Sequence, residues 1–294
     1  MGQILITGGT GFVGSQIRDH LADRELSLLV RDPSSAAHVR TAKVVRGDVT
    51  DPASLATAMS GVETVIHLVA IIEESGGRNF DVIIRQGTEN IVQAARAAGV
   101  RRFIHMSALG AQNNPAYPYL HAKWGAEQAV RDSGMDWTIF RPSVIFGPGD
   151  GFINVLANLV RKAPVIPVVG SGASNFHPVA VADVADAYKR ALDDPATISQ
   201  TYEIGGGEIY TYEQMLDLIA AHLNTRKPKV HMPVGLMKLV VNFSSPLPKP
   251  LRPPVTREQL NMLGLDNCTD ASATGDLIGR PPVSLRDGMS YIRR

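Results

Sequence analysis

Three side chains near the middle of the chain have the types and spacing that suit proton transfer. Tyr119 and Lys123 are four positions apart, so a helix opening after Pro118 would project both from one face. A free tyrosine has a pKa of about 10, so a nearby lysine cation must lower that pKa before the phenolate can accept a proton. Ser107, which ends an apolar run, would orient or polarise a substrate oxygen. These residues predict acid-base chemistry at a hydroxyl or carbonyl, although the spacing alone is a short pattern with little specificity.

A glycine-rich turn at the amino terminus predicts a binding site for a second reactant. The apolar run at residues 4–7 leads into this turn, and Val13, Ile17 and Leu21 then give the following helix one apolar face. A pyrophosphate can approach the N–H groups of such a helix only where no Cβ holds it off. We therefore predict a dinucleotide site with contacts from Gly8, Thr10, Gly11, Phe12, Val13 and Gly14.

The elements that position these groups alternate between short β-branched runs and helical patterns. This alternation predicts an α/β fold, a Rossmann-type doubly wound parallel sheet with helices on both faces. The expected strands are 3–7, 26–30, 43–47, 64–70, 102–107 and 137–145. The expected helices are 12–23, 53–59, 79–98 and 120–133. We assign residues 1–150 to this NAD(P)-binding domain.

Beyond residue 150 the chain is richer in Pro and Gly and predicts a smaller, mixed α/β lobe that covers the substrate. The expected helices are 152–161, 183–193, 211–223 and 256–263, and capping boxes at Thr211 and Thr256 mark the starts of two of them. The strands near 201–204 and 229–232 are expected to interleave with the main sheet. The lobe, residues 151–294, is therefore only partly separate from the first domain.

The turn Thr7-Gly8-x-x-Gly11-x-x-Gly14 resembles the fingerprint of the short-chain dehydrogenase/reductase superfamily, in its extended or atypical branch. The resemblance implies that Ser107, Tyr119 and Lys123 line the nicotinamide, with Lys123 bound to the nicotinamide ribose. Ligands of doubly wound sheets lie at the carboxyl ends of the strands. The resemblance also implies contacts from Asp48 and Val49 at the adenine, although Asp48 could instead cap a turn. Further cofactor contacts are expected from Leu68, Val69, Ala70, Met106, Pro142 and Val144.

The end of the second strand bears on the choice between NADP and NAD. Arg31 lies 20 positions after Gly11, where an acidic side chain would bind the ribose 2′-hydroxyl and a guanidinium would pair with a 2′-phosphate. This favours NADP(H). NAD remains open, because a shift of one residue in the strand boundary would turn Asp32 inward instead.

Two tracts, residues 141–154 and 253–267, resemble the nucleotide-binding accessory subunit of respiratory complex I and its bacterial relatives. This resemblance implies a tightly held NADP(H) and a role near a quinone-reducing complex. We predict an oxidoreductase for a small carbonyl or hydroxyl compound, or a subunit associated with a quinone reductase. A non-catalytic nucleotide-binding accessory or assembly protein and a sugar-nucleotide epimerase or dehydratase remain alternatives.

Four other polar residues could have either a functional or a purely structural role. His67, inside an apolar strand, is expected to be a core histidine with satisfied hydrogen bonds. Asn90 is either part of the active-site support or a helix-surface amide. Asp183 is expected to be a helix N-cap, and His177 a structural histidine. No metal site is expected.

Composition limits the partners. The chain has 294 residues, with 29 Lys and Arg against 28 Asp and Glu, so no bulk charge favours nucleic acid or an anionic membrane. The single cysteine, Cys268, and the lack of a leader or spanning segment predict a cytoplasmic protein. The superfamily often dimerises through helices equivalent to 79–98 and 120–133, which leaves an oligomer open.

Residues 233–251 combine an almost wholly apolar stretch with a segment rich in Pro and Ser. The stretch is too short to span a bilayer. Two alternatives stay open for it: burial against the second lobe, or peripheral contact with a membrane complex or lipid at the inner membrane face.

Overall fold

The computed structural model describes residues 2–244 and 256–293. Contacts between Cα atoms divide the chain into two compact units. The first comprises Met1–Pro142, Val181–Ile204 and Ala271–Pro281, and the second comprises Ser143–Ala180, Gly205–Asp270 and Pro282–Arg294. Each unit is described by itself below.

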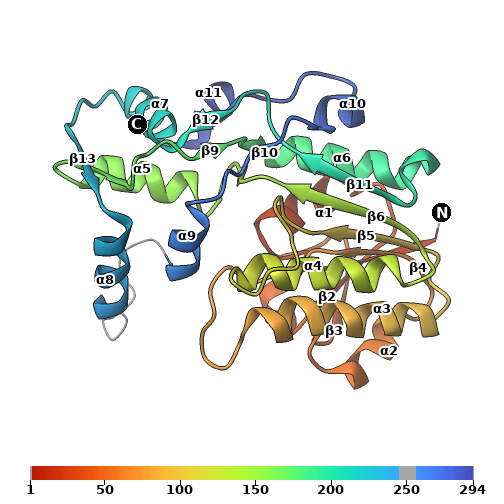
Figure 1. Cartoon of the computed structure of the whole chain (residues 1–294). Coiled ribbons are helices and arrows are strands. Elements are labelled where there is room, and N and C mark those ends of the chain that lie inside the picture. Colours follow the sequence, from red (N-terminus) through yellow and green to blue (C-terminus); the bar gives the residue numbers. More distant parts are fainter. Residues whose placement is uncertain (1, 245–255, 294) are drawn as a thin grey trace. The chain divides into compact units, whose positions relative to one another are not determined.

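A seven-stranded parallel sheet forms the centre of the first unit (Figure 1). Its strand order is β11-β6-β5-β4-β1-β2-β3, so the order reverses between β1 and β4. All five residues of β2 are buried, as expected for a parallel strand covered on both faces. The strands are β1 (Gln3–Thr7), β2 (Leu26–Val30), β3 (Lys43–Arg46), β4 (Val62–His67), β5 (Arg102–Met106), β6 (Asp136–Pro142) and β11 (Gln200–Ile204).

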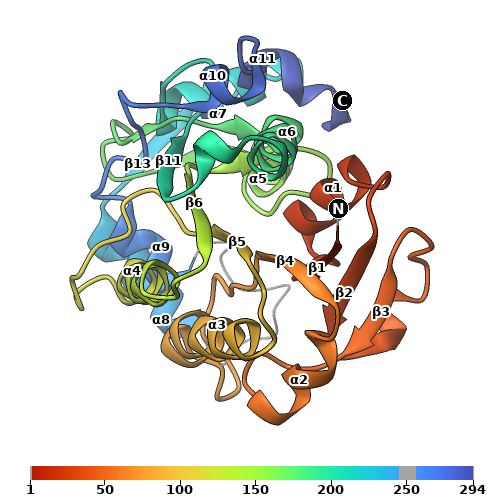
Figure 2. The ribbon, with the colours of Figure 1, turned by 90° about the vertical axis from the view of Figure 1, so that its right-hand side faces the viewer.

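Helices cover both faces of this sheet. Helices α1 and α6 pack together on one face, and α3 and α4 pack together on the other (Figure 2). The helices are α1 (Phe12–His20), α2 (Leu55–Ala58), α3 (Gly87–Ala97), α4 (Pro118–Arg131), α6 (Val181–Asp193) and α10 (Thr274–Ile278). A π-helical segment, η3 (Asp81–Gln86), leads directly into α3. Short 3-10 turns lie at η1 (Pro33–Ala36), η2 (Pro52–Ser54) and η4 (Pro195–Thr197).

The second unit has its own apolar core, to which Phe146, Leu216 and Ile219 contribute. Its helices are α5 (Ile153–Lys162), α7 (Tyr212–His222), α8 (Val234–Ser244), α9 (Arg257–Met262) and α11 (Leu285–Gly288), followed by the 3-10 turn η6 (Met289–Tyr291). Its strands form three pairs: β7 (Ile145–Phe146) with β10 (Val179–Ala180), β8 (Ile166–Val169) with β13 (Lys229–Met232), and β9 (Asn175–Phe176) with β12 (Tyr210–Thr211).

The predicted fold class is confirmed, and so are the two capping boxes, at Thr211 with Gln214 and at Thr256 with Gln259. The strand predicted near 201–204 joins the main sheet as β11, beside β6. The prediction that the strand at 229–232 also joins it is wrong, because β13 pairs with β8 in a separate two-stranded sheet. No helix in the described ranges is long and apolar enough to cross a membrane.

Candidate cofactor and catalytic site

Gly8, Gly11 and Gly14 lie close together in the turn after β1. Gly8 has φ +76°, which favours glycine, and the Gly11 N–H donates to the Gly8 carbonyl at 3.0 Å. A Cβ on Gly14 would lie 2.2 Å from that same carbonyl oxygen. The glycines at these positions are therefore what allows α1 to begin close to the end of β1.

The amino terminus of α1 is suited to an anion. Gly11 is the N-cap, no side chain caps the helix, and the first turn holds no acidic residue. The helix dipole and the first N–H groups therefore meet no competing charge from their own turn. Thr10 and Gly11 are exposed, and Phe12 and Val13 are half-buried. The turn supports the predicted pyrophosphate contacts, which remain predictions residue by residue.

The ends of β1 and β4 meet where the strand order reverses. The Leu68 N–H donates to the Thr7 carbonyl at 3.2 Å, and a Cβ on Gly8 would lie 3.2 Å from the Leu68 carbonyl carbon. In open parallel sheets a ligand lies in the crevice at this reversal. Leu68 and Val69 are half-buried and Ala70 is exposed, and their contacts with a cofactor stay predictions.

Arg31 and Asp32, the two candidates for contact with the adenosine ribose at the end of β2, have different surroundings. The Asp32 carboxylate accepts hydrogen bonds from the Ser34 N–H at 2.9 Å and the Ser34 hydroxyl at 2.7 Å. These bonds lower the pKa of Asp32 and commit it to capping η1. Arg31 is exposed, as is Arg46, whose backbone lies opposite Val30 in the β2–β3 ladder.

The loop after β3 is fixed by its own side chains. The Asp48 carboxylate accepts from the Thr50 N–H and the Thr50 hydroxyl, both at 2.9 Å, which is an Asx turn. The Asn90 side chain donates to the Val49 carbonyl at 2.8 Å. Asn90 therefore anchors the loop predicted to bind adenine, a role that neither interpretation of this amide included. Val49 is buried and packs against Gly87.

Lys123 is buried behind Tyr119 on the same helix, α4. Lys123 is only 2% exposed, and its ammonium donates to the Met106 carbonyl at 2.8 Å. Burial lowers the pKa of Lys123 to about 8, although the charge of Glu127 acts in the opposite direction. Ser107 follows directly after Met106. Its buried hydroxyl meets no strict hydrogen-bond criterion within the described residues, but it is near enough to the Glu127 carboxylate to help lower the pKa of that group.

Tyr119 has a less polar environment than the sequence suggested. Burial raises the pKa of its phenol to about 12, and Lys123 does not offset this. The predicted lowering of this pKa is therefore not produced by the protein's own groups, because the Lys123 ammonium is directed at the Met106 carbonyl. The Tyr119 ring is half-buried and meets the Phe80 ring edge-on, with centroids 5.6 Å apart.

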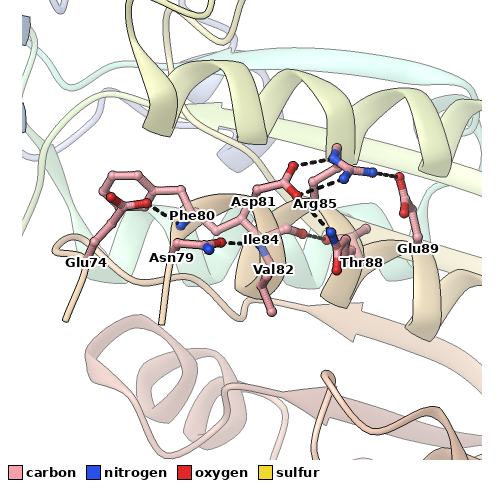
Figure 3. A network of polar contacts seen from close by, with 10 residues as sticks. Glu74, Asn79, Phe80, Asp81, Val82, Ile84, Arg85, Thr88 and Glu89 are labelled. Atoms are coloured by element: carbon pink, nitrogen blue, oxygen red, sulfur yellow. Dashed lines mark hydrogen bonds and ion pairs between the residues drawn. The ribbon is translucent and has the colours of Figure 1, made fainter. Parts of the chain in front are cut away.

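The segment that carries Phe80 is held by a local polar network (Figure 3). The Phe80 N–H donates to the Glu74 carboxylate at 2.8 Å, and the Val82 N–H donates to the Asn79 side chain at 2.7 Å. In η3 itself, Arg85 pairs with carboxylates on both sides, Asp81 and Glu89. The network fixes the start of the π-helical segment, and with it the apolar wall beside Tyr119.

Glu127 is a buried charge that the sequence analysis missed. Its side chain is fully buried, yet its carboxylate accepts from the Arg141 Nε and Nη2 at 2.7 Å each and from the Arg131 Nη1 at 2.9 Å. Burial raises the pKa of this carboxyl, but the bonds from Arg141, with smaller contributions from Ser107 and Arg131, lower it below its usual value. The available signal was its place one turn after Lys123, on the same helix face.

His67 is a core histidine with both ring nitrogens bonded, as predicted. Its Nδ1 lies 2.7 Å from the Thr7 hydroxyl and its Nε2 lies 3.0 Å from the Thr88 hydroxyl. Because the Thr88 hydroxyl donates to the Ile84 carbonyl, it accepts from His67, and the Thr7 hydroxyl donates to Nδ1. Burial lowers the pKa of His67 to about 3, so the ring is neutral. The His105 ring stacks on it, with centroids 5.5 Å apart.

Pro142 and Val144 are predicted nicotinamide contacts that belong to different units. In the first unit, the Pro142 carbonyl accepts from the Leu109 N–H at 2.9 Å. In the second unit, the Val144 N–H donates to the Asn267 side chain at 3.0 Å. His177, also in the second unit, is buried and packs against Gly205. The contacts of Pro142 and Val144 with a nicotinamide remain predictions.

The prediction that Asp183 is an N-cap is wrong. Helix α6 begins two residues earlier, at Val181, so Asp183 lies inside the first turn, where its buried carboxylate binds the Arg280 guanidinium at 2.7 Å. Cys268 is half-buried. Within residues 2–244 and 256–293, no group of three or more His, Cys, Asp or Glu side chains is placed to hold a metal ion.

Comparison with known proteins agrees with this geometry. A family model described as NAD(P)H-binding matches residues 8–195. The chain is 32% identical over 240 residues to ceramide reductase of Caulobacter vibrioides, covering 78% of this chain and 73% of the relative. It is 28% identical over 287 residues to NADH dehydrogenase (ubiquinone) 1 alpha subcomplex subunit 9 of Arabidopsis thaliana, covering 91% of this chain and 71% of the relative.

A solved structure of an NADPH-dependent quinone oxidoreductase from Escherichia coli, complexed with NADPH, has the same fold. Its TM-score is 0.78, its identity is 22%, and the match covers 98% of this chain and 99% of the other. These findings confirm the Rossmann-type fold and a nicotinamide dinucleotide as the cofactor. The chain belongs to the NAD(P)H-binding family, in the extended short-chain dehydrogenase/reductase type that its glycine fingerprint predicted.

Proposed function

We propose that this protein is an NADPH-dependent reductase of an uncharged carbonyl compound. The observation that carries the proposal is the arrangement on α4 and β5, where Tyr119 lies on the helix face that also carries the buried Lys123, and Ser107 follows the strand. Reduction of the carbonyl carbon would use the hydride that NADPH supplies when bound. Tyr119 gives its phenolic proton to the carbonyl oxygen, which balances the product as an alcohol. Ser107 orients that oxygen, and Lys123, whose ammonium donates to the Met106 carbonyl, holds the strand end that leads into Ser107.

The protonation state of Tyr119 suits the role of proton donor. Because its pKa is raised to about 12, the phenol holds its proton at neutral pH. A protonated tyrosine is ready to act as an acid toward a carbonyl, whereas oxidation of an alcohol needs the phenolate. The environment of Tyr119 therefore agrees with the proposed role as the acid in carbonyl reduction.

The class of substrate follows from the side chains around that phenol. Phe80 and Ile71 pack with Tyr119 around one small apolar cluster. Such a wall favours an apolar body beside the reacting carbonyl. Ceramide reductase and quinone oxidoreductase, by their names, act on compounds of this kind.

NADPH rather than NADH is the proposed coenzyme. Asp32, the residue that would favour a free 2′-hydroxyl, is bound to Ser34. Arg31 and Arg46 are exposed on neighbouring strand ends, where two guanidiniums suit a 2′-phosphate.

Substitution of the phenol tests the proposal. We expect Tyr119→Phe to retain NADPH binding, measured by calorimetry, and to lose turnover of quinones and apolar ketones by about 10²-fold or more. Tyr117→Phe, two residues earlier, is the matched control and should keep its rate. Equal rates for Tyr119→Phe and the wild type would overturn the proposal.

A non-catalytic nucleotide-binding subunit is the second candidate, favoured by the relative from Arabidopsis thaliana, which is named as a subunit of NADH dehydrogenase. It predicts a nucleotide that remains bound through purification and no turnover by the wild type over the same panel of carbonyl compounds. For either function, we place a peripheral contact in residues 233–251, of which 245–251 lie outside the described residues.

A further inference from the structure

Helix α8 presents an apolar strip to solvent. Leu236, Leu239, Val240 and Phe243 are 51%, 53%, 42% and 80% exposed. Their spacing of three, four and seven positions from Leu236 places them on one face of the helix. Met237, 8% exposed, lies off this strip, and α8 packs against α9. The helix is therefore attached to its unit by one side and turns apolar side chains outward on the other.

This concentration of apolar surface is unusual for the chain. Of the eight large hydrophobic side chains that are exposed in the described residues, four belong to this strip, and the other four are Ile72, Val165, Ile209 and Val230. Single exposed hydrophobic residues need no explanation, but a contiguous strip marks a surface that meets another apolar phase.

The charge around the strip indicates which phase that is. Residues 218–257 contain seven of the 29 Lys and Arg residues of the chain and none of its 28 Asp and Glu residues. The near-neutral chain therefore has a strongly basic segment, and the remainder is acidic. A basic segment around an apolar helix face complements an anionic lipid surface, which supplies negative headgroups beside acyl chains.

Some of these cations already have protein partners. Lys227 donates to three carbonyls at the end of α5, and Lys229 pairs with Glu213 and Asp217. In the described residues, Arg226 is exposed, and Lys238 is half-exposed on α8, on the side away from the strip. Lys249 and Arg252 lie outside the described residues and enter the argument only as charge in the sequence.

We propose that the α8 strip, Leu236, Leu239, Val240 and Phe243, docks on an anionic lipid bilayer with the helix lying in the plane of the interface. With 11 residues at about 1.5 Å per residue, α8 is too short to cross the hydrocarbon core. The proposal rests on the peripheral contact placed in this segment above and names its partner. It does not depend on turnover at Tyr119, although an apolar carbonyl compound would be concentrated in the same bilayer.

Flotation of the full chain with vesicles tests the docking. The vesicles are phosphatidylcholine alone and phosphatidylcholine mixed with phosphatidylglycerol. We expect the wild type to float with the mixed vesicles, less so at high salt and poorly with phosphatidylcholine alone. Leu239→Asp should lower the floated fraction about tenfold. Ile72→Asp, at a 63% exposed position of the first unit, should float like the wild type.

NADPH binding and thermal unfolding of Leu239→Asp should match the wild type, which shows that the loss is not misfolding. The proposal would be overturned if the wild type did not float, or if Leu239→Asp and Ile72→Asp floated equally. Equal flotation of the wild type with both vesicle types would overturn the preference for anionic lipid. A wild-type dimer that Leu239→Asp converts to a monomer, without flotation, would overturn it in favour of a second copy of the chain. Turnover measured with a water-soluble quinone tests the proposed reductase separately.

Discussion

The two compact units depart from the usual distribution of side chains in opposite directions. The first unit buries charge: Lys123 is 2% exposed and Glu127 is fully buried, although Lys and Glu are rarely buried unless paired. The second unit exposes apolar surface on α8, where Phe243 is 80% exposed. The buried charges are compensated, Lys123 by the Met106 carbonyl and Glu127 by two arginines.

The two departures have different physical consequences. A compensated buried charge has a fixed position and a shifted pKa, which suits chemistry at a defined atom. An apolar strip with no compensation from the described residues gains free energy only when another surface covers it. The first departure therefore predicts effects on stability and reaction, and the second predicts effects on association with little change in the fold.

Removing the buried carboxylate should have the largest effect. Glu127→Ala leaves Arg141 and Arg131 without their common partner in a buried site, so we expect the free energy of unfolding to fall by about 3–5 kcal/mol. Chemical denaturation measures it. Glu89→Ala, which breaks an exposed pair with Arg85, is the control and should cost about 0–1 kcal/mol. Similar losses in both variants would show that Glu127 is not a compensated buried charge.

The buried lysine should give stability a distinct pH dependence. The pKa of Lys123 is about 8 in the fold against an ordinary 10.5, so between these values the unfolded chain binds the additional proton. Unfolding free energy should therefore rise with pH in this window, by up to about 1.4 kcal/mol per pH unit. Above pH 10 the raised pKa of Tyr119 acts in the opposite direction.

Lys123→Met should remove that rise between pH 8 and 10, in denaturation curves recorded at each pH. Lys43→Met, at an exposed position of β3, should keep it. If Lys123→Met and the wild type have the same pH dependence, the ammonium is not destabilised by burial.

The strand limits beside the glycine-rich turn of the first unit could be predicted well from the sequence because local rules govern them. The limits of β1 and β2 were predicted to the residue, since the glycine turn ends one strand and Arg31-Asp32 ends the other. Strand β4 ends at His67 rather than at residue 70, because the following residues leave the ladder and approach Gly8. The lone polar residue inside an apolar strand, His67, was correctly assigned to the core.

What the sequence could not predict depends on contacts between distant residues. Glu127 and Arg141 are 14 positions apart on a helix and a strand, and no periodicity links them. The helix expected at 79–98 gave no sign of its π-helical segment, which brings Phe80 against Tyr119. The Tyr119 pKa was predicted from the nearby lysine alone, whereas burial by that apolar wall dominates.

Two exposed arginines at strand ends of the first unit, Arg31 and Arg46, allow a third, smaller test of the coenzyme. We expect Arg31→Ala and Arg46→Ala each to lower affinity for NADPH about tenfold to hundredfold and to leave affinity for NADH nearly unchanged. Calorimetry with both coenzymes measures the ratio. Arg96→Ala, at an exposed position of α3, is the control. An unchanged ratio would return the assignment to NAD.

The smallest expected effect on the free energy of unfolding is that of a substitution on the exposed face of α8, compared with one on its buried face. Leu239→Ser changes a side chain that is 53% exposed, so the free energy of unfolding should stay within about 0.5 kcal/mol of the wild type. Met237→Ser, two residues earlier and 8% exposed, should cost about 2 kcal/mol or more, since it removes a buried apolar group. Thermal or chemical denaturation of the two variants compares them on one helix. A large fall in the free energy of unfolding for Leu239→Ser would mean that the chain itself covers the strip. The second unit would then not differ from the first by an uncovered apolar surface.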